Sequence, residues 1–193
     1  SEDWGPITKI VEETLDIETE ILPVRESGFS AFVTIQIGCN NSCTFCIVPS
    51  VRGVEISRRP SDIINEIKNL SNEGVKEITL LGQNVNSYGR DLMIDNKRSP
   101  YFTQLLYKIH EIDGIERIRF TSPHPKDFKE ETLIAVSELP KIANQIHIPL
   151  QSGSDKILSS MHRGYNQKKY LSKIDMIENI IPDVSLYSDV IVG

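Results

Sequence analysis

The sequence predicts an α/β fold, an incomplete parallel (β/α) barrel of about five strands. Short apolar segments of strand character alternate with segments of helical periodicity from Phe29 onward. Strands separated by helices imply right-handed crossovers, and these place the strands in a parallel sheet. Because about five strands do not close a barrel, we expect a core that is cut at its carboxyl-terminal end.

Composition places limits on the class of protein. The chain has 193 residues, of which 39% are hydrophobic and 25% charged, as expected for one ordinary globular domain. Its net charge of -6 is unusual for a domain that binds nucleic acid through phosphate contacts alone, so such contacts are expected to be local or made by another domain. No apolar run approaches the roughly 20 residues of a membrane span and no secretory leader is evident, so we expect no membrane and a cytoplasmic location.

The first elements lead into a loop that contains every cysteine of the chain. Residues 1–28 are acidic and are expected to be a linker or an edge extension, whereas residues 29–193 form the core domain. An apolar run at 31–37 predicts the first strand, and the cysteine loop follows it. Ser61 is expected to cap the next helix, which ends at Gly74.

The remaining elements follow from periodicity. Asp127, with Glu130 three residues later, predicts the start of a helix that runs to Leu139. The other strands are expected at 76–82, 115–120, 145–150 and 184–192, and the other helices at 101–112, 154–161 and 167–180.

The carboxyl ends of the expected strands carry polar or glycine-rich turns. They comprise the cysteine loop, residues 82–84, 121–124 and 151–154, and Gly193. Parallel sheets hold their ligand sites at these ends, so the turns are expected to converge on one site. Asp189 supports this expectation, because a carboxylate in an apolar strand is costly unless it faces a polar site.

The three cysteines have the spacing C-x3-C-x2-C, within GCNNSCTFCIVPSVRG. A structural zinc site needs four ligands, and the nearest histidine, His110, is far away in sequence. A thioredoxin-type pair of Cys43 and Cys46 leaves Cys39 unexplained, and such a motif usually opens a helix, which Pro49 disfavours. An iron–sulfur cluster with one open iron fits the three thiols better, while a zinc centre and inert core thiols remain the alternatives.

The chain resembles the radical S-adenosylmethionine (SAM) superfamily, and within it the methylthiotransferases. The signature is C-x3-C-x-F-C, and the motifs SRRP, LLGQNVNSYG, TSPHP, IPLQSGSDKIL and MHRGY extend the resemblance over residues 29–193. It implies a six-stranded partial barrel of the radical SAM type. LLGQNVNSYG is similar to the MiaB type, which methylthiolates carbon 2 of isopentenyl-adenosine beside the tRNA anticodon.

The resemblance also implies residue roles. Cys39, Cys43 and Cys46 would hold a 4Fe-4S cluster whose open iron binds SAM, and Phe45 would pack over that cluster. Gly82 and Gln83 would receive the cofactor's amino group. The carboxylate and ribose would be held by Gln151, Ser152 and Arg163, since arginine suits a carboxylate. The expected cofactor-binding set is Phe45, Gly82, Gln83, Gln151, Ser152, Arg163 and Asp189.

The resemblance has two departures and implies several partners. MiaB-type proteins carry a second 4Fe-4S cluster on an amino-terminal domain and end in a small RNA-binding domain, and neither is present here. The whole protein would bind tRNA through the absent domains and take electrons from a flavodoxin-type or ferredoxin-type protein. Two alternatives stay open: a RimO-type enzyme that modifies a ribosomal-protein aspartate, and a zinc-stabilised, non-catalytic binding module.

Several polar residues keep both a structural and a functional interpretation. His124 and His147 are either structural or site residues, and His110 and His162 are expected at the surface. Arg52 is either solvated or a ligand contact. Arg58 and Arg59 are expected to be a solvated pair at a helix start, and Asn84 and Asn86 are expected in a turn.

Overall fold

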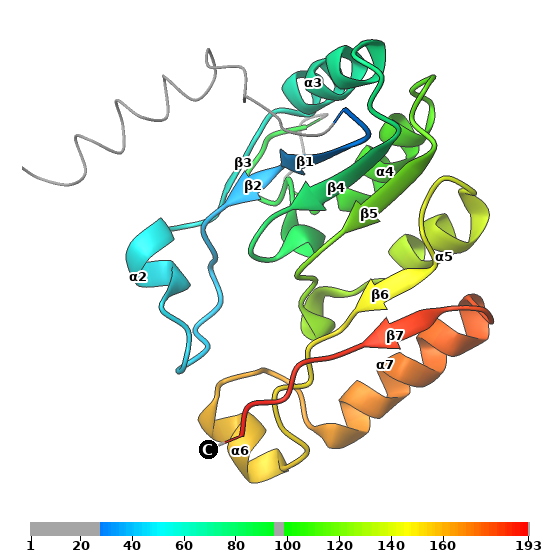
Figure 1. Cartoon of the computed structure of the whole chain (residues 1–193). Coiled ribbons are helices and arrows are strands. Elements are labelled where there is room, and N and C mark those ends of the chain that lie inside the picture. Colours follow the sequence, from blue (N-terminus) through cyan, green and yellow to red (C-terminus); the bar gives the residue numbers. More distant parts are fainter. Residues whose placement is uncertain (1–27, 95–98, 193) are drawn as a thin grey trace, which may run out of the picture.

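Figure 1 shows the computed structural model, which describes residues 28–94 and 99–192. Of the expected acidic linker at residues 1–28, all but Gly28 lies outside the described residues. The described part confirms an α/β fold with parallel strands. No helix within it is long and apolar enough to cross a membrane.

A parallel sheet forms the first half of the fold. Its strands are β1 (Ser30–Thr34), β4 (Glu77–Leu81) and β5 (Arg117–Phe120), in the order β1-β4-β5. Val33 pairs with Leu80, and both side chains are fully buried. On β1 the alternate residue Phe32 is 68% exposed, so the sheet has one covered and one open face.

The second half continues the array with β6 (Gln145–His147) and β7 (Ser185–Tyr187), which are also parallel. A bridge between Ile118 and Ile142 links β5 to the residues before β6. The predicted strands at 145–150 and 184–192 are too long.

The early end of β6 has a local cause. Pro149 has no N–H to donate, and the next N–H, that of Leu150, donates to the Ser188 hydroxyl at 2.9 Å. Strand pairing resumes only at a bridge between Gln151 and Val190.

The predicted strand at 31–37 is interrupted at Ile35, where the chain changes its pairing partner. The Ile35 N–H still donates to Leu81 O at 2.9 Å, whereas β2 (Gln36–Ile37) pairs antiparallel with β3 (Ile56–Ser57). The two-residue strand β3 has no periodic signature and was not predicted. This short hairpin carries the cysteine loop away from the main sheet (Figure 1).

The long helices lie along one side of the strands, and each contacts the next in sequence (Figure 1). They are α3 (Pro60–Asn72), α4 (Phe102–His110), α5 (Glu130–Glu138) and α7 (Gln167–Ile180). Each buries one face, as the helical periodicity predicts: in α4 the buried face is Phe102, Leu105, Leu106 and Ile109. The shorter α6 (Asp155–Ser160) follows the end of β6.

Three local predictions were wrong. Ser61 does not cap α3, because this helix begins at Pro60 and the Ser61 hydroxyl bonds Asp62. Asp127 does not start α5; it lies in a 3₁₀ turn, η2 (Pro125–Asp127). Pro49 does not exclude a helix, since it lies in the first turn of α2 (Val48–Arg52), where its missing N–H costs nothing.

Candidate cofactor-binding cavity

The cysteine loop is closed at its base by a backbone contact. The Cys39 N–H donates to Gly53 O at 3.2 Å, and both Gly38 and Gly53 have positive φ angles, 73° and 71°. A Cβ on Gly38 would lie 2.0 Å from Val54 O. The two ends of the loop can therefore approach this closely only because Gly38 has no side chain.

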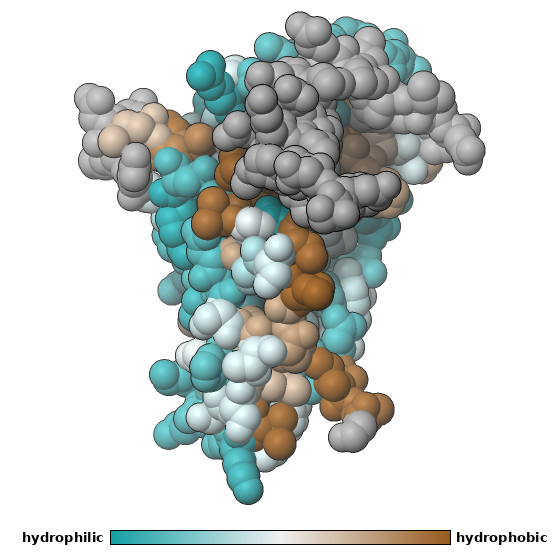
Figure 2. Space-filling view, turned by 90° about the vertical axis from the view of Figure 1, so that its left-hand side faces the viewer, coloured by the Kyte–Doolittle hydropathy of each residue, from teal (hydrophilic) through white to brown (hydrophobic). Residues whose placement is uncertain are grey.

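The loop projects from the sheet and exposes apolar side chains. Ile47, Val51 and Val54 are 69%, 61% and 69% exposed. Figure 2 views the side of the molecule on which α2 lies in Figure 1, and brown apolar surface interrupts the polar surface there. The loop is thus anchored at its base and accessible at its tip.

All three cysteines have free thiols. Cys39 and Cys43 are half-buried, and Cys46 is exposed. Burial raises the pKa of the Cys39 thiol, although a hydrogen bond from the Asn41 N–H at 3.4 Å opposes this. Among the described residues, no three His, Cys, Asp or Glu side chains lie close enough to hold one metal ion.

The cysteines share one cavity of about 210 Å³ with residues from the carboxyl ends of four other strands. The strand ends thus converge as the parallel topology predicts. The cavity is lined by Cys39, Asn41, Cys43, Phe45, Cys46, Pro49, Gln83, Ser122, Pro123, His124, His147, Pro149, Gln151, Arg163 and Asp189.

Most of the predicted site residues line this cavity, and two do not. Gly82 lies beside it, where a Cβ would be 3.2 Å from Val85 Cγ1, so the glycine allows close packing at the end of β4. The Ser152 hydroxyl accepts a hydrogen bond from the Ser154 N–H at 3.2 Å, within its own turn. The predicted residues on the lining are Cys39, Cys43, Cys46, Phe45, Gln83, Gln151, Arg163 and Asp189.

Gln83 supplies a buried acceptor without a partner. Its Oε1 is one of few buried side-chain atoms in the described part of the chain that lack a hydrogen bond. Leaving such an atom unpaired is costly, so a ligand donor in the cavity would stabilise it. Two other lining residues, Ser122 and Gln151, have left-handed backbone conformations with φ of 57° and 71°. Backbone strain of this kind clusters at ligand sites.

His147 and Asp189 form a polar pair in the cavity lining. The His147 Nε2 lies 2.8 Å from Asp189 Oδ2, and the imidazole stacks on Tyr187 with a centroid distance of 4.8 Å. The structure therefore places both residues at the cavity, which favours the site interpretation of His147.

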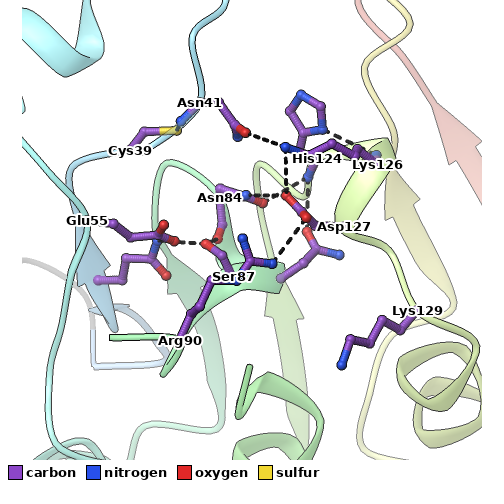
Figure 3. Close-up of polar contacts among 12 residues, drawn as sticks. Cys39, Asn41, Glu55, Asn84, Ser87, Arg90, His124, Lys126, Asp127 and Lys129 are labelled. Carbon is purple, nitrogen blue, oxygen red and sulfur yellow. Dashed lines mark hydrogen bonds and ion pairs between the residues drawn. The ribbon is translucent and has the colours of Figure 1, made fainter. Parts of the chain in front are cut away.

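Figure 3 shows the polar network under the cavity, which joins three loops. Asn84 donates to Asp127 Oδ2 at 2.8 Å, and Arg90 reaches Asp127 Oδ1 at 3.2 Å. Lys126 Nζ reaches across to Asn41 Oδ1 of the cysteine loop at 2.8 Å. The loops after β4 and β5 are therefore tied to each other and to the cysteine loop.

Two titratable groups of this network have shifted pKa values. Burial, reinforced by the Arg163 charge, lowers the pKa of His124 to about 3. Its Nδ1 accepts the Lys126 N–H at 3.2 Å, so the ring is neutral. For Asp127, burial would raise the pKa, but the Asn84 hydrogen bond and nearby Lys126 and Arg90 outweigh it and lower the pKa.

A second buried cluster lies beneath the base of the cysteine loop (Figure 3). Gln36 is fully buried and donates to Glu55 Oε1 at 2.5 Å and to Ser87 Oγ at 3.1 Å. Burial raises the pKa of Glu55, against the opposing effect of the Gln36 hydrogen bond. The Glu55 N–H donates to Asn40 Oδ1 at 3.1 Å. The hairpin is thereby fixed to the loop that it carries.

Some lining residues had no predicted role. Asn41, Ser122, Pro123 and Pro149 were not among the predicted site residues, although the turn at 121–124 was expected at a strand end. Position after a parallel strand was the available signal for Ser122 and Pro123. The remaining polar candidates lie elsewhere. Arg52 is exposed and off the cavity, and Arg58, with a side chain that is 36% exposed, bonds Thr34 O and Glu66.

The fold and the site define an α/β protein in which three free cysteines and the ends of parallel strands line one cavity. Residues 33–193 match the radical SAM superfamily. The chain belongs to this superfamily.

Curated relatives are similar over nearly the whole chain. It is 49% identical over 187 residues to the tRNA-2-methylthio-N(6)-dimethylallyladenosine synthase of Thermoanaerobacter pseudethanolicus, which covers 97% of this chain and 39% of the relative. The synthase of the same name from Clostridium botulinum (strain Eklund 17B / Type B) is 53% identical over 187 residues, covering 95% of this chain and 40% of the relative. The chain thus spans about two fifths of the length of these relatives.

Solved structures show the same fold at low sequence identity. The radical SAM methyltransferase TsrM from Kitasatospora setae matches with a TM-score of 0.60 and 15% identity, covering 84% of this chain and 30% of that one. The cobalamin-dependent SAM radical enzyme OxsB matches with a TM-score of 0.59 and 16% identity, covering 83% and 23%. These similarities concern the fold alone.

Proposed function

We propose that this chain is the radical SAM core of a tRNA methylthiotransferase that modifies carbon 2 of isopentenyl-adenosine next to the anticodon. The observation that carries the proposal is the joint placement of three free cysteines and the unpaired Gln83 oxygen at one cavity. The identity of about 50% to synthases of this name supports the particular reaction.

The donor set fits a three-cysteine 4Fe-4S cluster with SAM on its open iron. Cys39, Cys43 and Cys46 would hold the cluster, which when reduced supplies the electron for cleavage of SAM to a 5′-deoxyadenosyl radical. Gln83 Oε1 would accept a hydrogen bond from the cofactor's ammonium group. Gln151 and Asp189, on neighbouring strand ends, would bind its remaining polar groups.

The fold supports the same reading. The parallel order β1-β4-β5, linked by the bridge between Ile118 and Ile142 to the parallel pair β6-β7, supports an incomplete barrel whose strand ends would surround the cavity. Phe45 lines the cavity within the cysteine loop, where its ring would shield the cofactor from water. The chain's contribution is thus to position the cofactor and exclude solvent.

The whole protein would need partners beyond this segment. We propose tRNA as substrate, a flavodoxin-type or ferredoxin-type electron donor, a second 4Fe-4S cluster on a further domain, and a cytoplasmic location. The alternative of RimO-type protein modification shares the cavity chemistry and differs in substrate. The zinc-stabilised binding module differs in metal.

Anaerobic reconstitution tests the cofactor part of the proposal. The chain is incubated with iron and sulfide, reduced with dithionite and supplied with SAM, and 5′-deoxyadenosine is quantified. We expect brown protein with iron and sulfide, and product that depends on the reductant. Colourless protein with stoichiometric zinc would support the binding module, and an intact cluster without product would remove the radical chemistry.

A segment exchange tests the substrate. This chain replaces the matching two fifths of the Thermoanaerobacter relative, and the hybrid is expressed in cells that lack their own tRNA methylthiotransferase. We expect methylthiolated adenosine in tRNA digests by mass spectrometry. Methylthiolation of a ribosomal protein in place of tRNA would instead establish the RimO-type alternative.

A further inference from the structure

Arg163 connects the turn after α6 to the cysteine loop. Its side chain is 5% exposed. The guanidinium donates from Nη1 to the Cys43 sulfur at 3.3 Å. Its other nitrogens are held by Tyr165 and Pro149: Nε donates to the Tyr165 hydroxyl at 3.0 Å and Nη2 to Pro149 O at 3.3 Å. All three nitrogens of this buried cation therefore have partners, and one of them is a predicted cluster ligand.

The residue after Cys43 is attached to the same turn. Thr44 donates its N–H to Met161 O at 3.2 Å and its hydroxyl to Ser160 O at 2.9 Å. These carbonyls lie at the end of α6, where helical carbonyls lack partners within the helix. Two consecutive residues of the cysteine loop are thus fixed to one helix end.

The turn itself is shaped to present Arg163. His162 before it and Gly164 after it both have positive φ angles, 53° and 74°. A left-handed residue other than glycine is uncommon and persists where surrounding contacts enforce it. The hydrogen bonds of Arg163 to Cys43 and of Thr44 to Ser160 and Met161 join this turn to the cysteine loop.

The hydrogen bonds of Arg163 differ from those of an arginine that binds the cofactor's carboxylate. An arginine that binds a carboxylate side-on uses its Nε and Nη2 donors together. In this chain those donors bind Tyr165 and Pro149, and the remaining nitrogen, Nη1, is directed to the Cys43 sulfur. The Arg163 side chain is only 5% exposed, so the surrounding protein restricts it to this arrangement.

We propose that Arg163 is a positioning residue for the cluster: it donates a hydrogen bond to the Cys43 sulfur and makes the cluster easier to reduce. The inference rests on the proposed function, since it requires a cluster on Cys43. One-electron reduction adds negative charge to the cluster and its thiolates. A cationic donor stabilises the more negative state more strongly, which raises the reduction potential.

The test compares the full 193-residue chain with its variants after anaerobic reconstitution. The midpoint potential of the cluster is measured by a redox titration followed by electron paramagnetic resonance. We expect Arg163→Met to lower the reduced-to-oxidised ratio at a fixed potential about tenfold, equal to roughly 59 mV for one electron. Arg163→Lys, which keeps the charge, restores part of this shift, and Arg59→Met, at an exposed arginine, leaves the potential unchanged.

Each outcome decides between the alternatives. A wild-type potential in Arg163→Met with full iron content overturns the inference, whereas loss of cluster from a folded Arg163→Met supports it. If Arg163→Met does not fold, Tyr165→Phe decides, because it frees Nε and keeps the arginine. A midpoint potential of Tyr165→Phe that is lowered, but by less than in Arg163→Met, supports the inference, and an unchanged potential overturns it. A wild-type chain that takes up no cluster would overturn the proposed function, and this inference with it.

Discussion

The side-chain oxygen of Asn84 accepts a hydrogen bond from the backbone N–H of His124 at 3.2 Å, joining the loops that follow β4 and β5. Asn86 accepts from the same N–H at 3.0 Å. Both asparagines are almost fully buried, with 2% and 4% exposure. They therefore connect two walls of the cavity, a role that their expected position in a turn did not indicate.

Replacing Asn84 with alanine is expected to destabilise the fold by about 2 kcal/mol. The change removes the donor to Asp127 and an acceptor for the His124 N–H, and unpaired buried polar groups cost ~1–3 kcal/mol each. Urea denaturation measures the free energy of unfolding. Asn72→Ala, at an exposed position in α3, is the control and should change it by less than about 0.5 kcal/mol. Equal losses in the two variants would show that the loop connection contributes nothing.

Sequence reasoning was most successful where the determinants are local. The helical period of residues 167–180 predicted α7 with the bounds that the structure has. The spacing of the cysteines and their position after a strand predicted a loop at the carboxyl edge of the sheet. Each of these features depends on residues that are neighbours in sequence.

The features that were missed depend on contacts between distant segments. The break at Ile35 arises because Gln36 pairs with Ser57 of a hairpin that has no periodic signature. Asp127 resembles a helix start in sequence, but Asn84 and Arg90 hold its carboxylate in the network under the cavity. Such partner choices are settled by tertiary packing, which a local pattern does not encode.

Stability is expected to fall between neutral and mildly acidic pH because of His124. Its folded pKa is about 3 and its unfolded pKa roughly 6.5, so between these values the unfolded chain binds a proton that the folded chain does not. The resulting loss in the free energy of unfolding is absent above the unfolded pKa and reaches ~2 kcal/mol at about pH 5.

The variant His124→Asn isolates this contribution. Asparagine keeps an acceptor for the Lys126 N–H but does not titrate, so the loss of stability between about pH 7.5 and 5 should shrink by ~2 kcal/mol. Urea denaturation at each pH measures it, with His162→Asn at an exposed histidine as the control. A pH dependence identical to that of the wild type would show that His124 is not held neutral. The charges of Arg163, Lys126 and Asp127 remain the same in this comparison.

Cys43→Ala is expected to lose both the cluster and the formation of 5′-deoxyadenosine. Two thiolates leave a second iron without a protein ligand, so the cluster is not retained. Iron and sulfide analysis and the product assay measure the two losses. Ser42→Ala, one residue away and exposed, is the matched control and should retain both. Retention of the cluster by Cys43→Ala would remove this cysteine from the ligand set.

Two glycines at the base of the cysteine loop allow the effect of a steric clash to be compared with the effect of a positive φ angle alone. Gly38 and Gly53 have nearly equal φ angles, 73° and 71°. A Cβ on Gly53 meets nothing within 4 Å, whereas a Cβ on Gly38 would lie 2.0 Å from Val54 O. Gly53→Ala should therefore cost only the strain of its own backbone conformation, φ 71° and ψ −159°, which is roughly 1–3 kcal/mol.

Gly38→Ala should cost clearly more than Gly53→Ala, because the backbone at Val54 must also move. This movement would break the hydrogen bond from the Cys39 N–H to Gly53 O and displace the first cysteine from the cavity. We therefore expect Gly38→Ala to lose iron after reconstitution and Gly53→Ala to keep it, with unfolding in urea measured in parallel. Equal stability and equal iron content in the two variants would mean that closure of the loop base does not position Cys39.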